Sequence, residues 1–166
     1  LITIGKLREH RREMKRANII IITKCPLNIS KEQKKEISKK MNLKSHQTIY
    51  FSEIKKYNFI DMCSSRRINI SKNENHILLT GIENPKKLLD FLTNQKINYQ
   101  HINFKDHHDF KESDISTIIN LKNSMNYSNN LLLTEKDYYR FSKNHKKILE
   151  KNFNLICVQI EIDFIG

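Results

Sequence analysis

The sequence predicts an α/β protein with a mostly parallel sheet flanked by helices. Apolar runs of strand length, such as ANIIIITK (17–24) and NHILLTGI (75–82), alternate with segments that carry helix start signals. The first is a continuous apolar run, as expected for a strand that is buried on both faces, and the second indicates another buried strand. A chain of 166 residues has room for one compact core, so we expect a single lobe over 1–166.

The first expected element is a basic helix, residues 1–16, that enters this lobe. The helical pattern covers 6–15, and its four-residue spacing places three arginines on one face: Arg8, Arg12 and Arg16. Taken alone, such a face is most often a solvated surface.

A strand, a helix and a second strand are expected next. The strand over 17–24 ends at Pro26, and Ser30 is placed to cap a polar helix that runs to about Met41. The segment QTIYFSEI (47–54) is rich in β-forming residues.

The middle of the chain is expected to pass from a connector into a buried strand. Residues 55–75 are polar and irregular, which is typical of a connector. The strand over 75–82 then leads to a helix, which Asn84 can cap with Pro85 at the first helical position.

The remaining elements continue the alternation of strands and helices. They are a strand over 97–104, a helix from Ser113 or Asp114 to about Met125, a strand that ends at Thr134, a helix that opens at Glu135, and a final strand over 153–162.

Composition limits the classes of function. The net charge of +12 invites a nucleic-acid partner. However, Lys supplies 23 of the 30 basic residues, and Lys, Asn and Ile are the residues that an AT-rich genome favours. A nucleic-acid surface built on Arg8–Arg16 should also carry aromatic residues for stacking, and this segment has none. We therefore keep a basic nucleic-acid-binding module only as an alternative, and expect no nucleic-acid partner.

Membrane and disulfide signals are weak. The longest apolar run, Ile19–Ile22, is strand-sized and far below the roughly 20 residues of a membrane span. The first residues are apolar and the charges follow, which is the reverse of a signal peptide, and the chain does not start with Met. Three scattered cysteines predict neither a disulfide framework nor a zinc site, and they fit a reducing cytoplasm.

Three polar clusters follow predicted strands: TGIENP (80–85), KDHHDF (105–110) and TEKD (134–137). Sites in α/β sheets gather at the carboxyl ends of the strands. This coincidence predicts a functional site at one edge of the sheet.

KDHHDF is open to four interpretations. It can be a solvated loop in which Asp106 or Asp109 caps the next helix. A mononuclear metal site lacks a third ligand at diagnostic spacing. A DHH phosphoesterase would need a glycine-rich loop, and this chain has only Gly5, Gly81 and Gly166. The fourth interpretation is a histidine that acts in acid/base chemistry beside a carboxylate, as phosphoryl transfer to a hydroxyl requires.

The other two clusters also have structural interpretations. TEKD can be a helix start with acidic residues in the positive end of the helix dipole. GIENP can be a turn glycine before a capped helix. Each signal is modest, and their order along the chain carries more information.

That order resembles the C-terminal half of the tetraacyldisaccharide 4'-kinase (lipid A 4'-kinase) family, in a Bacteroidetes-like form. The matching segments are GKLRE (5–9), KRANIIIITKCP (15–26), TGIENPKKLLDFL (80–92), FKDHHDF (104–110) and LLLTEKD (131–137). The resemblance covers nearly the whole chain and is vaguest over 27–75. It implies the second lobe of a two-lobed P-loop-type kinase.

The resemblance also implies roles for particular residues. His107 would assist a catalytic aspartate of the other lobe in deprotonating the 4'-hydroxyl, and Asp106 would orient His107. Arg8 would face substrate phosphate, which a guanidinium suits well. No role carries over to His108. Further residues at the same site would be Gly81, Asn84, Glu135, Lys136 and Asp137.

Two positions depart from the family pattern. Glu83 stands where a small residue is usual, which puts nucleotide contacts there in doubt, and Asn18 replaces a common Asp.

The family transfers the γ-phosphate of ATP, with Mg²⁺, to a tetraacylated disaccharide 1-phosphate. The Walker A loop and an acidic motif would lie in the N-terminal lobe, and no GxxxxGK[ST] occurs in these 166 residues. The resemblance therefore implies a fragment, a split gene or a decayed copy without that lobe, inactive alone and with no metal ligands of its own. A separately encoded lobe would be a partner. The expected place is the cytoplasm, peripheral on the cytoplasmic face of the inner membrane.

Overall fold

The computed structural model describes residues 11–26, 28–124 and 127–165. Contacts within the chain group its residues into two compact units, Leu1–Lys56 with Glu161–Gly166, and Tyr57–Ile160. Strands β2 (Thr48–Asp61) and β7 (Asn154–Ile165) contribute residues to both units. The single lobe that the sequence predicts over 1–166 stays a prediction.

In the first unit, β1 (Ile19–Cys25) pairs in parallel with the start of β2. The expected strand is present, but it is not buried on both faces, because Ile19 and Ile21 are exposed. Of the predicted basic helix, residues 6–10 lie outside the described residues, and Arg11–Arg16 form a 3-10 helix, η1. A 3-10 turn spaces its residues by three rather than 3.6, so an arginine face at four-residue spacing is not maintained there.

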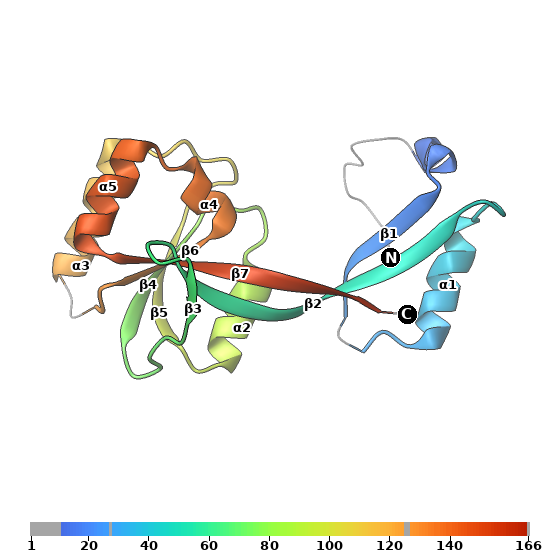
Figure 1. Ribbon diagram of the computed structural model, residues 1–166, viewed down its shortest axis with the longest axis horizontal. Coiled ribbons are helices and arrows are strands. Elements are labelled where there is room, and N and C mark those ends of the chain that lie inside the picture. Colours follow the sequence, from blue (N-terminus) through green and yellow to red (C-terminus); the bar gives the residue numbers. More distant parts are fainter. Residues whose placement is uncertain (1–10, 27, 125–126, 166) are drawn as a thin grey trace. The chain divides into compact units, whose positions relative to one another are not determined.

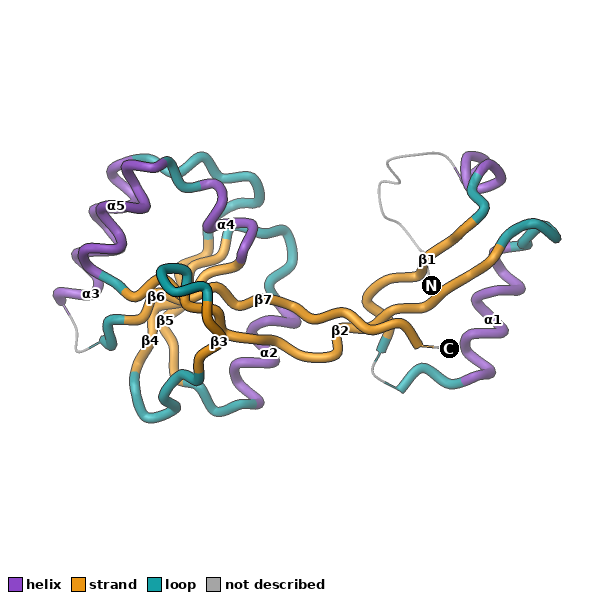
Figure 2. The backbone as a smooth tube through the Cα atoms, viewed as in Figure 1, coloured by secondary structure: helices purple, strands orange, loops and turns teal. Residues whose placement is uncertain are grey.

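Helix α1 (Lys31–Met41) begins and ends where the sequence predicts. The Ser30 hydroxyl accepts a hydrogen bond from the Gln33 backbone, and the Gln33 side chain accepts one from the Ser30 backbone, which is a capping box. At the other end Asn42 takes the left-handed conformation common after helices. Figure 2 shows α1 beside the β1–β2 pair.

The second unit is built on parallel strands. Its strand order is β7-β6-β4-β5, where β4 is Asn75–Thr80, β5 is Asn98–Asn103 and β6 is Asn130–Thr134. The pairs β4–β5, β4–β6 and β6–β7 are all parallel. The predicted mixed α/β fold with a mostly parallel sheet is confirmed.

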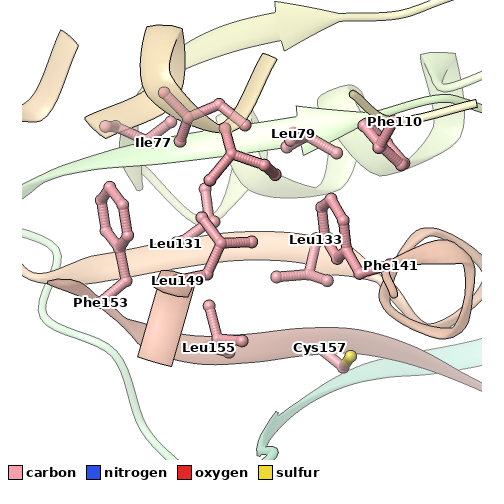
Figure 3. Packing of buried hydrophobic residues seen from close by; sticks show 12 residues of the cluster. Ile77, Leu79, Phe110, Leu131, Leu133, Phe141, Leu149, Phe153, Leu155 and Cys157 are labelled. Atoms are coloured by element: carbon pink, nitrogen blue, oxygen red, sulfur yellow. The ribbon is translucent and has the colours of Figure 1, made fainter. Parts of the chain in front are cut away.

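Helices cover both faces of this sheet, with α2 on one side and α3 and α5 on the other (Figure 1). The alternation of side chains along the strands explains the two cores. Ile77, Leu131 and Leu155 point to the side of α3 (Glu112–Ser124) and α5 (Lys143–Asn152), as Figure 3 shows for the cluster around Leu149. Their neighbours Leu78, Leu132 and Ile156 point to α2 (Lys86–Asn94), which contributes Leu88 and Leu92.

The expected irregular connector over 55–75 is wrong in its first half. Strand β2 continues to Asp61, and β3 (Arg66–Ile68) pairs with it in antiparallel fashion. The reason is aromatic alternation: the Tyr57 ring stacks on Phe91 of α2 with centroids 4.4 Å apart, and Phe59 packs into the same core.

Two smaller differences concern helices. Pro85 occupies the N-cap position of α2 rather than its first turn, and Asn84 accepts a hydrogen bond from the Lys86 backbone through its side chain. Helix α5 was not predicted, because its sequence is largely polar and Leu149 is its one fully buried residue. In the part of the chain that the structure describes, no helix is long and apolar enough to span a bilayer.

Candidate functional site

The three predicted polar clusters lie together at the carboxyl ends of β6, β4 and β5, which are neighbours in the sheet. Gly81 follows β4, Asp106 and His107 follow β5, and helix α4 (Glu135–Arg140) starts directly after β6. A backbone hydrogen bond joins the ends of β4 and β5, because the Phe104 N–H donates to the Thr80 carbonyl over 2.7 Å. Parallel pairing puts these ends at one edge of the sheet, where sites of open α/β proteins gather.

A buried ion pair anchors α4 to the loop after β4. Asp137 is fully buried and accepts hydrogen bonds from the Thr134 hydroxyl (2.6 Å) and from Arg140 Nη1 (3.2 Å). Arg140 Nη1 also donates to the Gly81 carbonyl over 2.7 Å. The Thr134 hydroxyl in turn caps α4 by accepting from the Asp137 N–H. One guanidinium group thus holds two of the three clusters together.

Gly81 is favoured at this position by space and not by backbone conformation. A Cβ atom there would lie 3.1 Å from Asp137 Oδ1 and 3.2 Å from Arg140 Nη1, which is tighter than ordinary contact. The absence of a side chain lets the ion pair approach the strand end.

A second ion pair links the loop after β5 to α4. Lys136 Nζ donates to Asp106 Oδ1 over 2.9 Å, and both side chains are partly exposed. This hydrogen bond, together with the positive charges nearby, holds the pKa of Asp106 below its ordinary value near 3.8. Asp106 is therefore a carboxylate across the physiological range.

His107 projects from a tight turn beside that carboxylate. The His108 N–H donates to the Lys105 carbonyl, and His107 takes a left-handed backbone conformation (φ 59°), which is uncommon for a residue with a side chain. Its side chain is 73% exposed, and its Nε2 lies 3.5 Å from Asp106 Oδ2. The turn therefore presents the His107 ring to solvent at the end of β5.

His108 has structural partners instead. Its Nε2 lies 2.8 Å from Asp114 Oδ2 at the start of α3, and its ring stacks on Phe104 with centroids 4.5 Å apart. Asp114 also accepts from the Lys111 backbone (2.8 Å). The two histidines are therefore not equivalent: His107 is presented to solvent, whereas His108 fastens the loop to α3 and to the aromatic core.

The other predicted site residues are placed less centrally. Glu135 is exposed at the first position of α4. Burial raises the pKa of the nearby Cys157 thiol to about 12, and the negative charge of Glu135 is the second cause of this rise. Asn84 is exposed and serves the start of α2 through its contact with Lys86. Arg8 lies outside the described residues.

Arg140 was not predicted as a site residue from the sequence. One weak indication was available: Arg140 follows Asp137 by three positions, so both lie on the same helix face. Most basic residues of this chain are lysines, which makes an arginine there less ordinary. A side chain that reaches a backbone carbonyl of another loop cannot be recognised from spacing alone.

The described residues contain no group of three or more His, Cys, Asp or Glu side chains that could hold a metal ion. Mg²⁺ needs several oxygen ligands in octahedral geometry. Two of the acidic residues near the site are already engaged, Asp137 by Arg140 and Asp106 by Lys136. These residues do not by themselves fit Mg²⁺, and no chemical step is assigned to a metal here.

The Asp106–Lys136 pair can be tested by titration. Replacing Lys136 by methionine should raise the pKa of Asp106 toward 3.8, because the hydrogen bond that stabilises its charged form is lost. Since the folded-state pKa is lowered, the pair stabilises the fold above pH 3.8, and this contribution is lost as the pH falls through the lower, folded-state pKa. The readout is the NMR shift of the Asp106 carboxyl carbon. Lys105→Met, in the same loop, is the control; an equal shift in both variants would contradict the assignment.

The fold and the site together define a class: an open α/β protein with a charged site at the carboxyl ends of its parallel strands. The comparisons with known proteins give the family. The family model for tetraacyldisaccharide-1-P 4'-kinase matches residues 1–165. The chain therefore belongs to the tetraacyldisaccharide-1-P 4'-kinase family, which is a family of kinases.

Curated relatives are consistent with this membership. The tetraacyldisaccharide 4'-kinase of Flavobacterium johnsoniae is 36% identical over 144 residues, which cover 84% of this chain and 40% of the relative. That of Bacteroides thetaiotaomicron is 29% identical and covers 99% of this chain and 47% of the relative. A crystal structure of LpxK from Aquifex aeolicus in complex with ATP is 13% identical, with a TM-score of 0.47, and covers 99% of this chain and 44% of that one. This chain thus spans less than half the length of these relatives.

Proposed function

We propose that this chain supplies the second half of a tetraacyldisaccharide 4'-kinase of lipid A biosynthesis. The reaction is the transfer of the ATP γ-phosphate to the 4'-hydroxyl of a tetraacylated disaccharide 1-phosphate. The observation that carries the proposal is the presentation of His107, beside a charged Asp106, at the strand-end site of a chain whose family match extends over residues 1–165.

In this reaction His107 helps to remove the proton of the 4'-hydroxyl, together with an aspartate of the other half. The freed oxygen attacks the γ-phosphorus while the bond to the β-phosphate oxygen breaks, which leaves ADP. Asp106 orients the imidazole, and Lys136 holds Asp106 in place. Arg140 and Asp137 fix the loops that carry these groups.

ATP and Mg²⁺ would be held mainly by the half that relatives carry beyond the matched segment. These 166 residues contain no GxxxxGK[ST] phosphate loop, and Asp106 and Asp137 at the described site are engaged in ion pairs. The acceptor carries four acyl chains, so the enzyme would work at a lipid surface, as a peripheral protein on the cytoplasmic face of the inner membrane. Arg8 would bind acceptor phosphate.

The proposal can be tested with a fusion enzyme, in which these 166 residues replace the matched segment of the Flavobacterium johnsoniae 4'-kinase. Transfer of radiolabelled phosphate from ATP to the tetraacyldisaccharide 1-phosphate is measured. The isolated chain should show no transfer above a control without protein, because it lacks a phosphate cradle. The fusion enzyme should show transfer. A folded but inactive fusion, or an active isolated chain, would overturn the proposal.

A further inference from the structure

One large aromatic side chain is exposed beside the strand-end site. Tyr139 of α4 is 66% exposed, and Ile160 is the other large exposed hydrophobic residue among the described residues of the second unit. A single exposed apolar side chain is ordinary on a protein surface. Tyr139 differs from such a residue in the fixed orientation of its ring and in its place next to the charged groups of the site.

Contacts with two neighbours fix the orientation of the Tyr139 ring. It meets the Tyr138 ring edge to face, with centroids 5.4 Å apart and ring planes at 79°. The ammonium of Lys146, from the following helix α5, lies 5.4 Å from the Tyr139 centroid and 4.1 Å from the Tyr138 centroid (Figure 1). Tyr138 in turn packs against the core cluster that contains Leu149. A ring that is already held in place loses little conformational freedom when a ligand stacks on it.

Helix geometry places Tyr139 next to Lys136. The two residues are three positions apart, and side chains at this spacing are neighbours on a helix surface. Both are exposed. Lys136 Nζ donates to Asp106 Oδ1, and Asp106 Oδ2 lies 3.5 Å from His107 Nε2. The aromatic ring, the ion pair and the proposed acid/base histidine therefore form a continuous row from α4 to the loop after β5.

This row matches the chemistry of a sugar ring. A glucosamine pyranose in its chair form carries its polar groups around the rim, so both of its faces present C–H groups. Such a face packs on an aromatic ring, whose π face is negative. The rim hydroxyls can exchange hydrogen bonds with the exposed Lys136 and Glu135. Small-molecule sites commonly combine an aromatic wall with a few placed polar groups in this way, whereas an acyl chain would need a longer apolar surface than one ring supplies.

We propose that Tyr139 is the platform on which a pyranose ring of the acceptor disaccharide stacks while the 4'-hydroxyl is at His107. This inference rests on the proposed function, since it names a contact by which the same site holds its acceptor. The stacked ring is bound equally before and during phosphate transfer. Tyr139 therefore contributes to acceptor binding, and His107 contributes to the rate of the chemical step. Tyr138 and Lys146 hold the platform from below without touching the acceptor.

The binding test uses this chain alone and a water-soluble probe. The ¹⁵N-labelled chain is titrated with the deacylated disaccharide 1-phosphate, which retains the 4'-hydroxyl, and Kd is taken from the amide shifts. Tyr139→Ala should raise Kd by about fivefold or more, as expected when an aromatic contact residue is truncated. Tyr139→Phe keeps the ring and should leave Kd within about twofold. The matched control is Tyr50→Ala, at an exposed tyrosine of the first unit that also meets a neighbouring ring edge to face; it too should leave Kd within about twofold.

The kinetic test uses the fusion enzyme with the tetraacylated acceptor. Tyr139→Ala should raise the Michaelis constant of the acceptor by about fivefold or more. It should leave kcat and the Michaelis constant of ATP within about twofold, because an interaction made equally in the ground state and the transition state is lost.

Several results would overturn the inference. No binding of the disaccharide by the wild-type chain, or equal weakening by Tyr139→Ala and Tyr50→Ala, would remove the platform. If Tyr139→Phe weakens binding as much as Tyr139→Ala, the contact is made by the hydroxyl and not by the ring. A raised Michaelis constant for ATP alone would assign the ring to the purine, and an effect that is confined to the tetraacylated acceptor would assign it to an acyl chain.

Failure of the proposed function has a different signature. An inactive fusion enzyme contradicts the kinase reaction. Disaccharide binding that depends on the Tyr139 ring supports the platform in that case too, because the binding test does not require phosphate transfer.

Discussion

Replacing His107 by alanine is expected to lower the kcat of the fusion enzyme by about 10² to 10⁴-fold, while both Michaelis constants change little. Acid/base assistance of a hydroxyl contributes on this order, and the interaction is made mainly in the transition state. The structural basis is the exposed imidazole, 3.5 Å from a carboxylate that Lys136 keeps charged. Steady-state kinetics with varied ATP and varied acceptor separates kcat from the two constants.

Two other variants serve as controls for this result. His108→Ala should lower kcat far less, since His108 fastens its loop to Asp114 and Phe104. Arg8→Ala should act mainly on the Michaelis constant of the acceptor if Arg8 holds a ground-state phosphate. If His108→Ala is the crippling change and His107→Ala is nearly silent, the assignment of the two histidines is wrong. If both are silent, this segment is only a polar turn.

Replacing Asp137 by alanine is expected to lower the free energy of unfolding by about 3 kcal/mol. The carboxylate is fully buried, and its removal leaves the Arg140 guanidinium, which is 19% exposed, without its charged partner. Loss of one member of a buried ion pair typically costs on the order of 3–5 kcal/mol. Arg140 Nη2 is already buried without a hydrogen-bond partner among the described residues, so the neutral Gly81 carbonyl would remain as the printed contact of the guanidinium.

Urea unfolding, with the signal and slope compared between variants, measures this change. The matched control is Asp109→Ala, which removes a carboxylate from an exposed position of the neighbouring loop and should change the free energy by less than about 0.5 kcal/mol. An Asp137→Ala variant as stable as the control would show that the ion pair does not hold α4 to the strand ends.

Elements with strong local signals were predicted well from the sequence. The strand β4 has three consecutive apolar residues at its centre and is almost wholly buried, and the helices after Ser30 and Thr134 begin at side chains that do accept the capping hydrogen bond. In these places the local signal and the tertiary environment agree, so one pattern suffices.

Elements that depend on distant partners were predicted poorly. The second half of β2 is polar by composition, and only the packing of Tyr57 and Phe59 on α2 gives it a buried side. Helix α5 has a single fully buried residue, Leu149. The exposure of Ile19 and Ile21 on β1 could not be foreseen, because a continuous apolar run predicts a strand that is covered on both faces.

The features of the candidate site also divide into those that the sequence predicts and those that it does not. That Gly81, His107 and Glu135 lie at one edge of the sheet was predictable, because parallel strands end at the same edge. That their strands are neighbours was not predicted. The contact of Arg140 with the Gly81 carbonyl was not, because it depends on the length and direction of α4. The difference between His107 and His108 also emerges only from the turn, which exposes one ring and directs the other to Asp114.

Mapping the acceptor on this chain tests the central claim, that the strand-end residues form the acceptor side of a kinase site. The isolated chain is labelled with ¹⁵N and titrated with tetraacyldisaccharide 1-phosphate in detergent, against detergent alone. We expect the acceptor-specific amide shifts to gather at Gly81, Asp106, His107 and the start of α4, and to spare the outer surface of α5. Shifts that gather on α5, or that are the same with detergent alone, would contradict the account.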